Sequence, residues 1–277
     1  MRIKFILGVI LFVLLSCSTS QKNEPSPEKK KATIYYNQGT NELVKKEYAN
    51  ALKHLLEARA LDPKSSKIHN NLGMAYYFKK RPETAIKMIK KAIELDANNM
   101  DARMNLGTIY TNTGRFIEAK AQYEKILDNL TYNYQFKTYY NLGILNHKQG
   151  RKRRAINYYQ QAVNENNNFC PAHRALGNIY FEYKDYEKSL KHYKDATMGT
   201  CYNNPINLYK QAQVLIKLKK YATAKLKLEE IMEKFSSGQI RNLASKDLKE
   251  ITPKVYQEPK IKLKENDKKR KILSPNF

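Results

Sequence analysis

Apolar residues recur at helical spacing along most of the chain, and residues 66–99 show the pattern most clearly. Leu72 and Tyr76 are four residues apart, so they share one face of a predicted helix. A second apolar stripe follows by steps of four and three residues: Ala85, Ile89 and Ala92. Pro82 lies between the stripes, where it can begin a second helix but cannot continue the first. The segment is therefore predicted to be two helices joined by a tight turn.

Three positions of this unit return together along the chain at intervals of 34 to 36 residues. The first series holds a small residue of the first helix: Gly39, Gly73, Gly107, Gly143, Gly177 and Ala212. The second holds a small residue of the second helix: Ala51, Ala85, Ala119, Ala155, Ser189 and Ala224. The third is Ala58, Ala92, Ile126, Ala162, Ala196 and Ile231. Small residues suit the first two positions because antiparallel helices approach closely where they cross.

This period and these positions resemble the tetratricopeptide repeat (TPR) family over about three quarters of the chain. The resemblance implies an all-α fold, a right-handed superhelical solenoid of six helix–turn–helix repeats. The expected repeats are 32–65, 66–99, 100–133, 136–169, 170–203 and 205–238. Trp, which is common early in the family's repeat, is absent, and Tyr35 and Tyr139 take its place in two copies. Residues 239–251 are expected to form a capping helix over the last repeat.

Residues 1–16 have the features of a secretory signal peptide. Two cations precede an apolar run at 5–15, which is too short to span a bilayer as a mature helix. The run ends in Leu-Leu-Ser-Cys, which resembles the lipobox of bacterial lipoproteins, with Leu14 three residues before Cys17. This resemblance implies cleavage before Cys17 and lipidation of its thiol. The alternative is an ordinary signal peptide in which Cys17 is incidental.

The predicted lipid sets the expected compartment. Ser18 follows the lipidated cysteine, and the sorting rule of enterobacterial lipoproteins then favours the outer membrane. Residues 17–31 are polar and contain two prolines, so they are predicted to be a flexible tether. We therefore expect a lipid-anchored chain that faces the periplasm. Nucleic acid is not an expected partner there, although residues 150–154 form a basic cluster.

The chain carries a formal net charge of +25. This charge favours anionic partners such as an acidic protein face, an anionic membrane or the cell wall. The alternative is that lysine merely fills the solvated faces of the helices. Residues 252–277 are rich in lysine and are expected to be a disordered basic tail.

Cys170 and Cys201 remain as an even pair in a chain that is predicted to be exported. Cys170 begins the first helix of the fifth repeat, and Cys201 lies near the end of that repeat. Because antiparallel helices bring these ends together, we predict a disulfide between them. The alternative is two independent buried thiols.

Signatures of enzymes and cofactors are missing from the sequence, which contains no phosphate-binding glycine loop, zinc-protease motif or nucleophile elbow. Since repeats occupy about three quarters of the chain, neither catalysis nor a cofactor is expected. His173 and His192 do not complete a tetrahedral ligand set of recognisable spacing, so no metal site is predicted.

A binding surface is the remaining function. In TPR proteins the first helix of each repeat lines the concave face, and this resemblance assigns one set of residues to a protein-binding groove: Tyr36, Asn37, Asn70, Asn71, Met74, Met104, Asn105, Thr108, Tyr140, Asn141, Ile144, Arg174 and Asn178. Asparagine amides can donate to and accept from an extended peptide. Alternatively, these amides bridge neighbouring repeats or meet only water.

The lipobox, the six repeats and the cysteine pair of the fifth repeat together resemble the pilotins of type IV pili, the PilF/PilW/Tgl family. The resemblance implies a non-enzymatic outer-membrane lipoprotein that helps the pilus secretin reach that membrane and assemble into a multimer. Its implied partner is a secretin subunit or another envelope protein. The alternative is a TPR scaffold lipoprotein that recruits peptidoglycan enzymes or other envelope enzymes, with its basic surface against the anionic wall.

Overall fold

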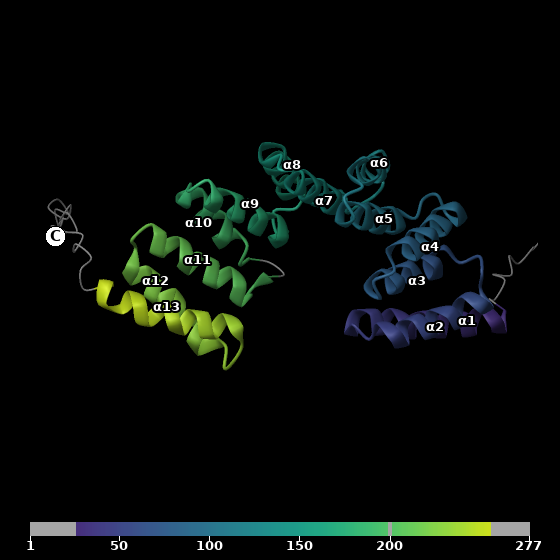
Figure 1. Cartoon of the computed structure of the whole chain (residues 1–277), viewed down its shortest axis with the longest axis horizontal. Coiled ribbons are helices and arrows are strands. Elements are labelled where there is room, and N and C mark those ends of the chain that lie inside the picture. The colour runs from purple at the N-terminus through teal and green to yellow at the C-terminus, as the bar shows by residue number, and fades with distance from the viewer. Residues whose placement is uncertain (1–25, 199–200, 256–277) are drawn as a thin grey trace, which may run out of the picture. The chain divides into compact units, whose positions relative to one another are not determined.

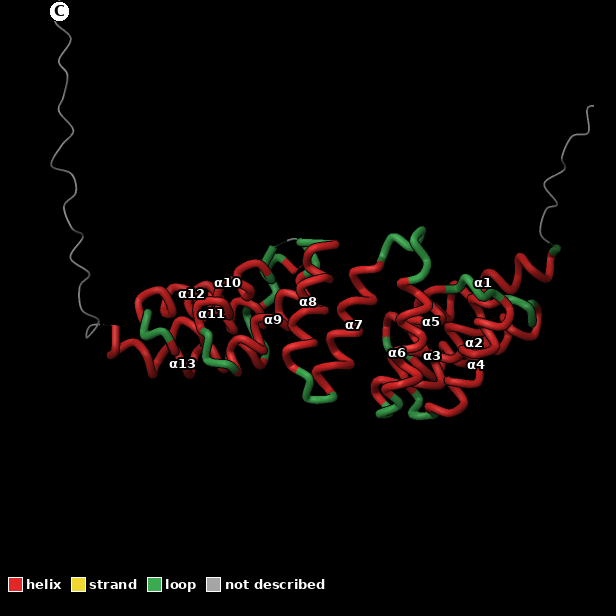
Figure 2. Tube along the Cα trace, turned by 90° about the horizontal axis from the view of Figure 1, so that it is seen from above, coloured by secondary structure: helices red, strands yellow, loops and turns green. Residues whose placement is uncertain are grey.

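A computed structural model describes residues 26–198 and 201–255, which form thirteen α-helices and no β-strand (Figures 1 and 2). The helices are α1 (Pro27–Lys45), α2 (Tyr48–Leu61), α3 (Ser66–Phe78), α4 (Pro82–Leu95), α5 (Met100–Asn112), α6 (Phe116–Leu127), α7 (Gln135–Lys148), α8 (Lys152–Glu165), α9 (Cys170–Glu182), α10 (Tyr186–Asp195), α11 (Pro205–Lys217), α12 (Tyr221–Lys234) and α13 (Gln239–Val255). The fold class is all-α, as predicted. None of the described helices is both long and apolar enough to cross a membrane.

The chain divides into two units, Met1–Ile109 and Tyr110–Phe277, with the boundary inside α5. In the first unit α1 packs against α2, and α3 packs against α4. The buried side chains of Leu55 and Leu72 form a core between these hairpins, and α2 and α3 are in direct contact. Each hairpin thus buries its apolar stripe against the next one, as expected of stacked repeats.

The second unit continues the same arrangement. α7 pairs with α8, α9 with α10 and α11 with α12, and α13 packs against α12. Ala244 and Ile251 of α13 are buried, and Ile240 and Leu248 pack against the same core cluster. The final helix therefore covers the apolar face of the last hairpin.

The glycine series marks the closest contact within the hairpins. A Cβ atom built on Gly39 would lie 2.7 Å from Cγ of Leu55, and one on Gly177 would lie 2.8 Å from the ring of Tyr193. In the same way, Ile89 packs against Gly73, and Tyr159 packs against the glycine of the fourth repeat. A large side chain of the second helix thus occupies the space that the missing Cβ leaves.

Two boundaries differ from the sequence prediction. α1 begins at Pro27, so residues 27–31 of the predicted tether are helical. The Ser26 side chain accepts a hydrogen bond from the backbone N–H of Lys29, and Pro27 occupies the first helical turn, where it costs no hydrogen bond. α13 runs to Val255 and includes Pro253, because a proline in the last turn removes only one backbone hydrogen bond.

We expect Gly143→Ala to destabilise the chain by about 1–2 kcal/mol, because the added methyl group meets the buried ring of Tyr159. Repeat six supplies the matched control, since Ala212 and Leu228 occupy the same two positions there. The double variant Gly143→Ala/Tyr159→Leu copies that pair and should show a favourable coupling of about 1 kcal/mol in urea denaturation. Strictly additive effects would contradict this account of the contact.

Candidate protein-binding surface

In the first unit, three predicted asparagines belong to one hydrogen-bonded chain, which we call the amide chain. Asn105 Nδ2 donates to Asn70 Oδ1 at 2.9 Å, and Asn70 Nδ2 donates to Asn71 Oδ1 at 3.2 Å. Asn71 Nδ2 then donates to the hydroxyl of Thr40 at 2.9 Å, which itself donates to the carbonyl of Tyr36 at 2.7 Å. The amide chain joins α5, α3 and α1, so these asparagines link neighbouring repeats.

The remaining predicted residues of the first unit are more accessible. Asn37 is exposed, and four further side chains are half-buried: Tyr36, Met74, Met104 and Thr108. The Thr108 hydroxyl donates to the Met104 carbonyl at 2.9 Å, so its polar group is used within its own helix. What this surface offers a partner is therefore aromatic and thioether contact beside the amide chain.

In the second unit the same positions carry different chemistry. Tyr140 packs edge-to-face on Phe169 with ring centroids 5.3 Å apart, and its hydroxyl has a hydrogen bond with Arg174. Burial raises the pKa of Tyr140, and the neighbouring guanidinium opposes that shift. Asn141 and Ile144 are half-buried beside it. This contact joins α7 to α9, with an aromatic–arginine pair in place of the amides.

Asn178 is exposed, and its side-chain oxygen accepts a hydrogen bond of 2.7 Å from the hydroxyl of Tyr193. This bond satisfies the only polar atom of a tyrosine whose ring is buried against Gly177. Burial raises the pKa of Tyr193, so it stays neutral and donates at physiological pH. Asn178 thus supports the hairpin from its exposed side.

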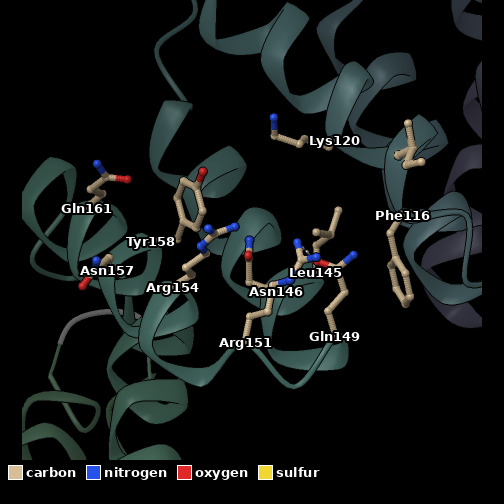
Figure 3. Close-up of a pocket in the computed structure, with 11 residues that line it drawn as sticks. Phe116, Lys120, Leu145, Asn146, Gln149, Arg151, Arg154, Asn157, Tyr158 and Gln161 are labelled. Atoms are coloured by element: carbon tan, nitrogen blue, oxygen red, sulfur yellow. Dashed lines mark hydrogen bonds between the residues drawn. The ribbon is translucent and has the colours of Figure 1, made fainter.

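A basic cleft of about 540 Å³ lies between α6, the end of α7 and α8 (Figure 3). Lys120 and Phe116 line it from α6, and Arg151, Arg154 and Tyr158 line it from the α8 side. The other lining residues are Ile117, Leu145, Asn146, Gln149, Asn157 and Gln161. The sequence analysis noted the basic turn at 150–154 but did not predict a cleft, because α6 belongs to the preceding repeat.

The charges of this basic cleft favour an anionic ligand. Its lining contains three cations and no carboxylate. Glu124 pairs with Lys120 at 2.8 Å and raises the pKa of that lysine. Arg151 donates to the side chain of Gln149 at 3.1 Å, and both residues line the cleft. The cleft can bind a carboxylate or phosphate group.

A disulfide joins Cys170 and Cys201, whose Cα atoms are 6.1 Å apart. Cys170 is the first residue of α9, and Cys201 follows α10. The bond therefore closes the open end of the α9–α10 hairpin. Cys17, the predicted lipidation site, lies outside the described residues, as do the signal peptide at 1–16 and residues 256–277 of the predicted tail.

The sequence analysis missed a cluster at the same end of this hairpin. Nδ1 of His173 lies 3.3 Å from Nδ1 of His192 and 3.7 Å from a carboxylate oxygen of Asp195. Burial, with His173 next in importance, lowers the pKa of His192 to about 4. The His192 ring is therefore neutral at physiological pH. Their separation in sequence conceals the cluster, because α9 contributes one ligand and α10 the other two.

Models of the tetratricopeptide repeat match residues 66–99, 99–164, 140–202 and 207–237. Together these matches cover more than half of the chain. No curated protein sequence matches the chain significantly.

Solved structures share the fold at low sequence identity. PilF of Pseudomonas aeruginosa superposes with a TM-score of 0.63 at 17% identity, over 80% of this chain and 98% of PilF. PilW, described as a widely conserved type IV pilus biogenesis factor, gives 0.64 at 18% identity, over 76% of this chain and 96% of PilW. The Cut9–Hcn1 hetero-tetramer of the APC/C gives 0.62 at 18% identity, over 82% of this chain but 44% of its match.

We expect Asn70→Ala to destabilise the chain by about 1–3 kcal/mol in urea denaturation. The substitution leaves the Asn105 donor and the Asn71 acceptor without their partner in a buried position. Asn37→Ala, at an exposed position of the same predicted face, is the control and should change stability by less than about 0.5 kcal/mol. Equal effects of the two substitutions would show that the amide chain contributes no stability.

Removing the disulfide should lower the free energy of unfolding by about 3–4 kcal/mol, since Cys170 and Cys201 are separated by 31 residues. The variant Cys170→Ala/Cys201→Ala can be compared with the oxidised parent by urea denaturation. The reduced parent is the control and should behave like the variant. A variant as stable as the oxidised parent would mean that packing alone closes this hairpin.

Proposed function

This chain belongs to the tetratricopeptide-repeat family, and we propose that it is a type IV pilus pilotin, which helps the pilus secretin to reach the outer membrane and to assemble into its multimer. The observation that carries the proposal is the extent of the match to PilF and PilW. The shared fold accounts for 98% and 96% of those chains, against 44% of the APC/C protein. A match over the whole length of a small protein is more specific than a match to part of a longer array of repeats.

The predicted location of the chain at the outer membrane supports the same proposal. A lipid on Cys17 would hold the chain at the outer membrane, facing the periplasm, where secretin subunits arrive. The Cys170–Cys201 bond fits an oxidising compartment. The mechanism is binding rather than catalysis, since TPR repeats serve typically as scaffolds for protein partners.

The half-buried apolar residues are the proposed contacts. The amide chain already uses hydrogen bonds of Asn70, Asn71 and Asn105 within the protein, although each amide has a second N–H for a partner. Met74 and Met104 lie beside it, half-buried, and can adapt to an apolar segment of a secretin subunit. These side chains, rather than an asparagine ladder, are therefore the proposed anchors in the first unit.

The basic cleft favours a second candidate function. Lys120, Arg151 and Arg154 can hold a carboxylate or phosphate, such as those of the anionic cell wall. A scaffold that recruits peptidoglycan enzymes would use such a contact. The two candidates differ in whether secretin assembly depends on this protein.

Deleting the gene should abolish detergent-resistant secretin multimers in outer-membrane fractions while secretin monomers remain. We expect the wild-type chain to restore the multimers and Met74→Glu to restore less than half of them, because a charge on this surface opposes an apolar contact. Leu226→Glu, at a residue of α12 that is 65% exposed, is the control and should restore them fully. Immunoblots of each variant check that its abundance is unchanged.

Multimers that persist unchanged after deletion would rule out the pilotin function. In that case binding of purified peptidoglycan to the wild-type chain and to Arg154→Glu would test the scaffold.

A further inference from the structure

The cluster of His173, His192 and Asp195 has the ligands of a metal site. One ligand atom from each residue lies within 4.8 Å of the other two. His192 and Asp195 are three residues apart on α10, so they share one face of that helix, and His173 faces them from α9. Imidazole nitrogens and a carboxylate oxygen are ligands that zinc accepts.

A backbone contact fixes which nitrogen of His173 is available. Nε2 of this ring lies 2.9 Å from the carbonyl oxygen of Asn167. A carbonyl can only accept, so Nε2 carries a proton. Nδ1, which faces the other two residues, is then the nitrogen that can offer a lone pair to a metal. Such a hydrogen bond from the outer nitrogen to a carbonyl is the usual support of a histidine that binds a metal.

The spacing of the two rings also fits a tetrahedral ion. Two nitrogens at about 2.0–2.1 Å from zinc, at the tetrahedral angle, are about 3.3–3.4 Å apart. The observed Nδ1–Nδ1 distance is 3.3 Å, and the Asp195 oxygen is 3.7 Å from His173. Small side-chain rotations are enough to place all three atoms around one ion.

Asp195 occupies a position that helix electrostatics disfavours. It is the last residue of α10, where the partial negative charge of the helix dipole repels a carboxylate. A bound cation would offset that repulsion. His173 is buried and Asp195 is partly exposed, so an ion would reach the cluster from the solvent side of Asp195.

Repeat two provides an internal comparison. His69 occupies the position of His173, four residues into its repeat, and is also buried. The positions that correspond to His192 and Asp195 hold Met88 and Lys91 there. His69 instead contacts the carbonyl of Ser65 through Nδ1 at 3.0 Å. The repeat can therefore bury a histidine at this position without a metal. Of these two repeats, only repeat five also has the two additional ligands.

We propose that His173, His192 and Asp195 bind one zinc ion, with water at the fourth position. Without the ion, Nδ1–H of His192 donates to Nδ1 of His173. On binding, that proton moves to Nε2 of His192, so both Nδ1 atoms become ligands and no net proton is released. The ion joins the start of α9 to the end of α10, beside the disulfide, and serves as a second cross-link of this hairpin.

Isothermal titration of the full chain with ZnCl2 tests the proposal. The protein carries no histidine tag, is treated with chelator and dialysed beforehand, keeps the Cys170–Cys201 bond, and carries Cys17→Ser so that this thiol cannot compete. We expect one ion per chain and a rise of about 5 °C in the melting temperature at saturating zinc. Co²⁺ in place of zinc should give the visible absorption of a tetrahedral site.

His192→Gln should weaken zinc binding about 100-fold, and Asp195→Asn at least about 10-fold. Both substitutions keep a polar group of similar size, and circular dichroism checks that the helices are retained. His69→Gln is the matched control and should leave zinc affinity unchanged. The absence of saturable binding in the parent would overturn the proposal. Stoichiometric binding that survives both His192→Gln and Asp195→Asn would overturn it equally, because the ion would then lie elsewhere.

Discussion

The close approach of two helices within each hairpin is the contact on which the rest of the structure depends. A residue without a side chain in the first helix faces a large buried side chain of the second, as with Gly39 and Leu55 or Gly177 and Tyr193. These large side chains of the second helix recur at the same intervals as the small residues of the first: Leu55, Ile89, Tyr123, Tyr159, Tyr193 and Leu228. Because this pair sets the helix separation locally, each repeat keeps its geometry while its outer faces change.

That freedom explains why equivalent positions carry different chemistry along the chain. In the first unit the amide chain joins α1, α3 and α5, because its asparagines donate to one another and to the hydroxyl of Thr40. In the second unit the same positions hold Tyr140 and Arg174, which connect α7 to α9 through a ring and a guanidinium. Polar contacts between repeats make the stacking specific, since an unpaired amide in a buried position is costly. The exposed side chains that are not used in these contacts are the ones that a partner can bind.

The sequence predicts the hairpins well because their pattern is local. Contacts between repeats join residues that are far apart in the sequence, so no local pattern identifies them. The glycine and alanine series identify the repeat and its helices without reference to a neighbour. The asparagines could not be assigned in the same way, because the partner of Asn71 lies 31 residues away and that of Asn105 lies 35 away. His173 and His192 were judged by motif spacing, which does not apply to ligands on two facing helices. The ends of the repeat array were predicted less well. The sequence analysis placed Pro27 in the tether and Pro253 in the tail, whereas Pro27 begins α1 and Pro253 lies inside α13.

Repeat five shows how a short second helix is held in place. α10 has 10 residues, against 14 in α8, so it is about one turn shorter. Side chains of α11 cover the carbonyls at the end of α10: Asn207 donates to Ala196 at 2.7 Å, and Gln211 donates to Tyr193 at 3.0 Å. These bonds satisfy backbone groups that a longer helix would pair internally. The disulfide lies at the same end, and so does the histidine cluster. The disulfide and the proposed metal site therefore link α9 and α10 at the end where the next repeat covers the last carbonyls of the shorter helix.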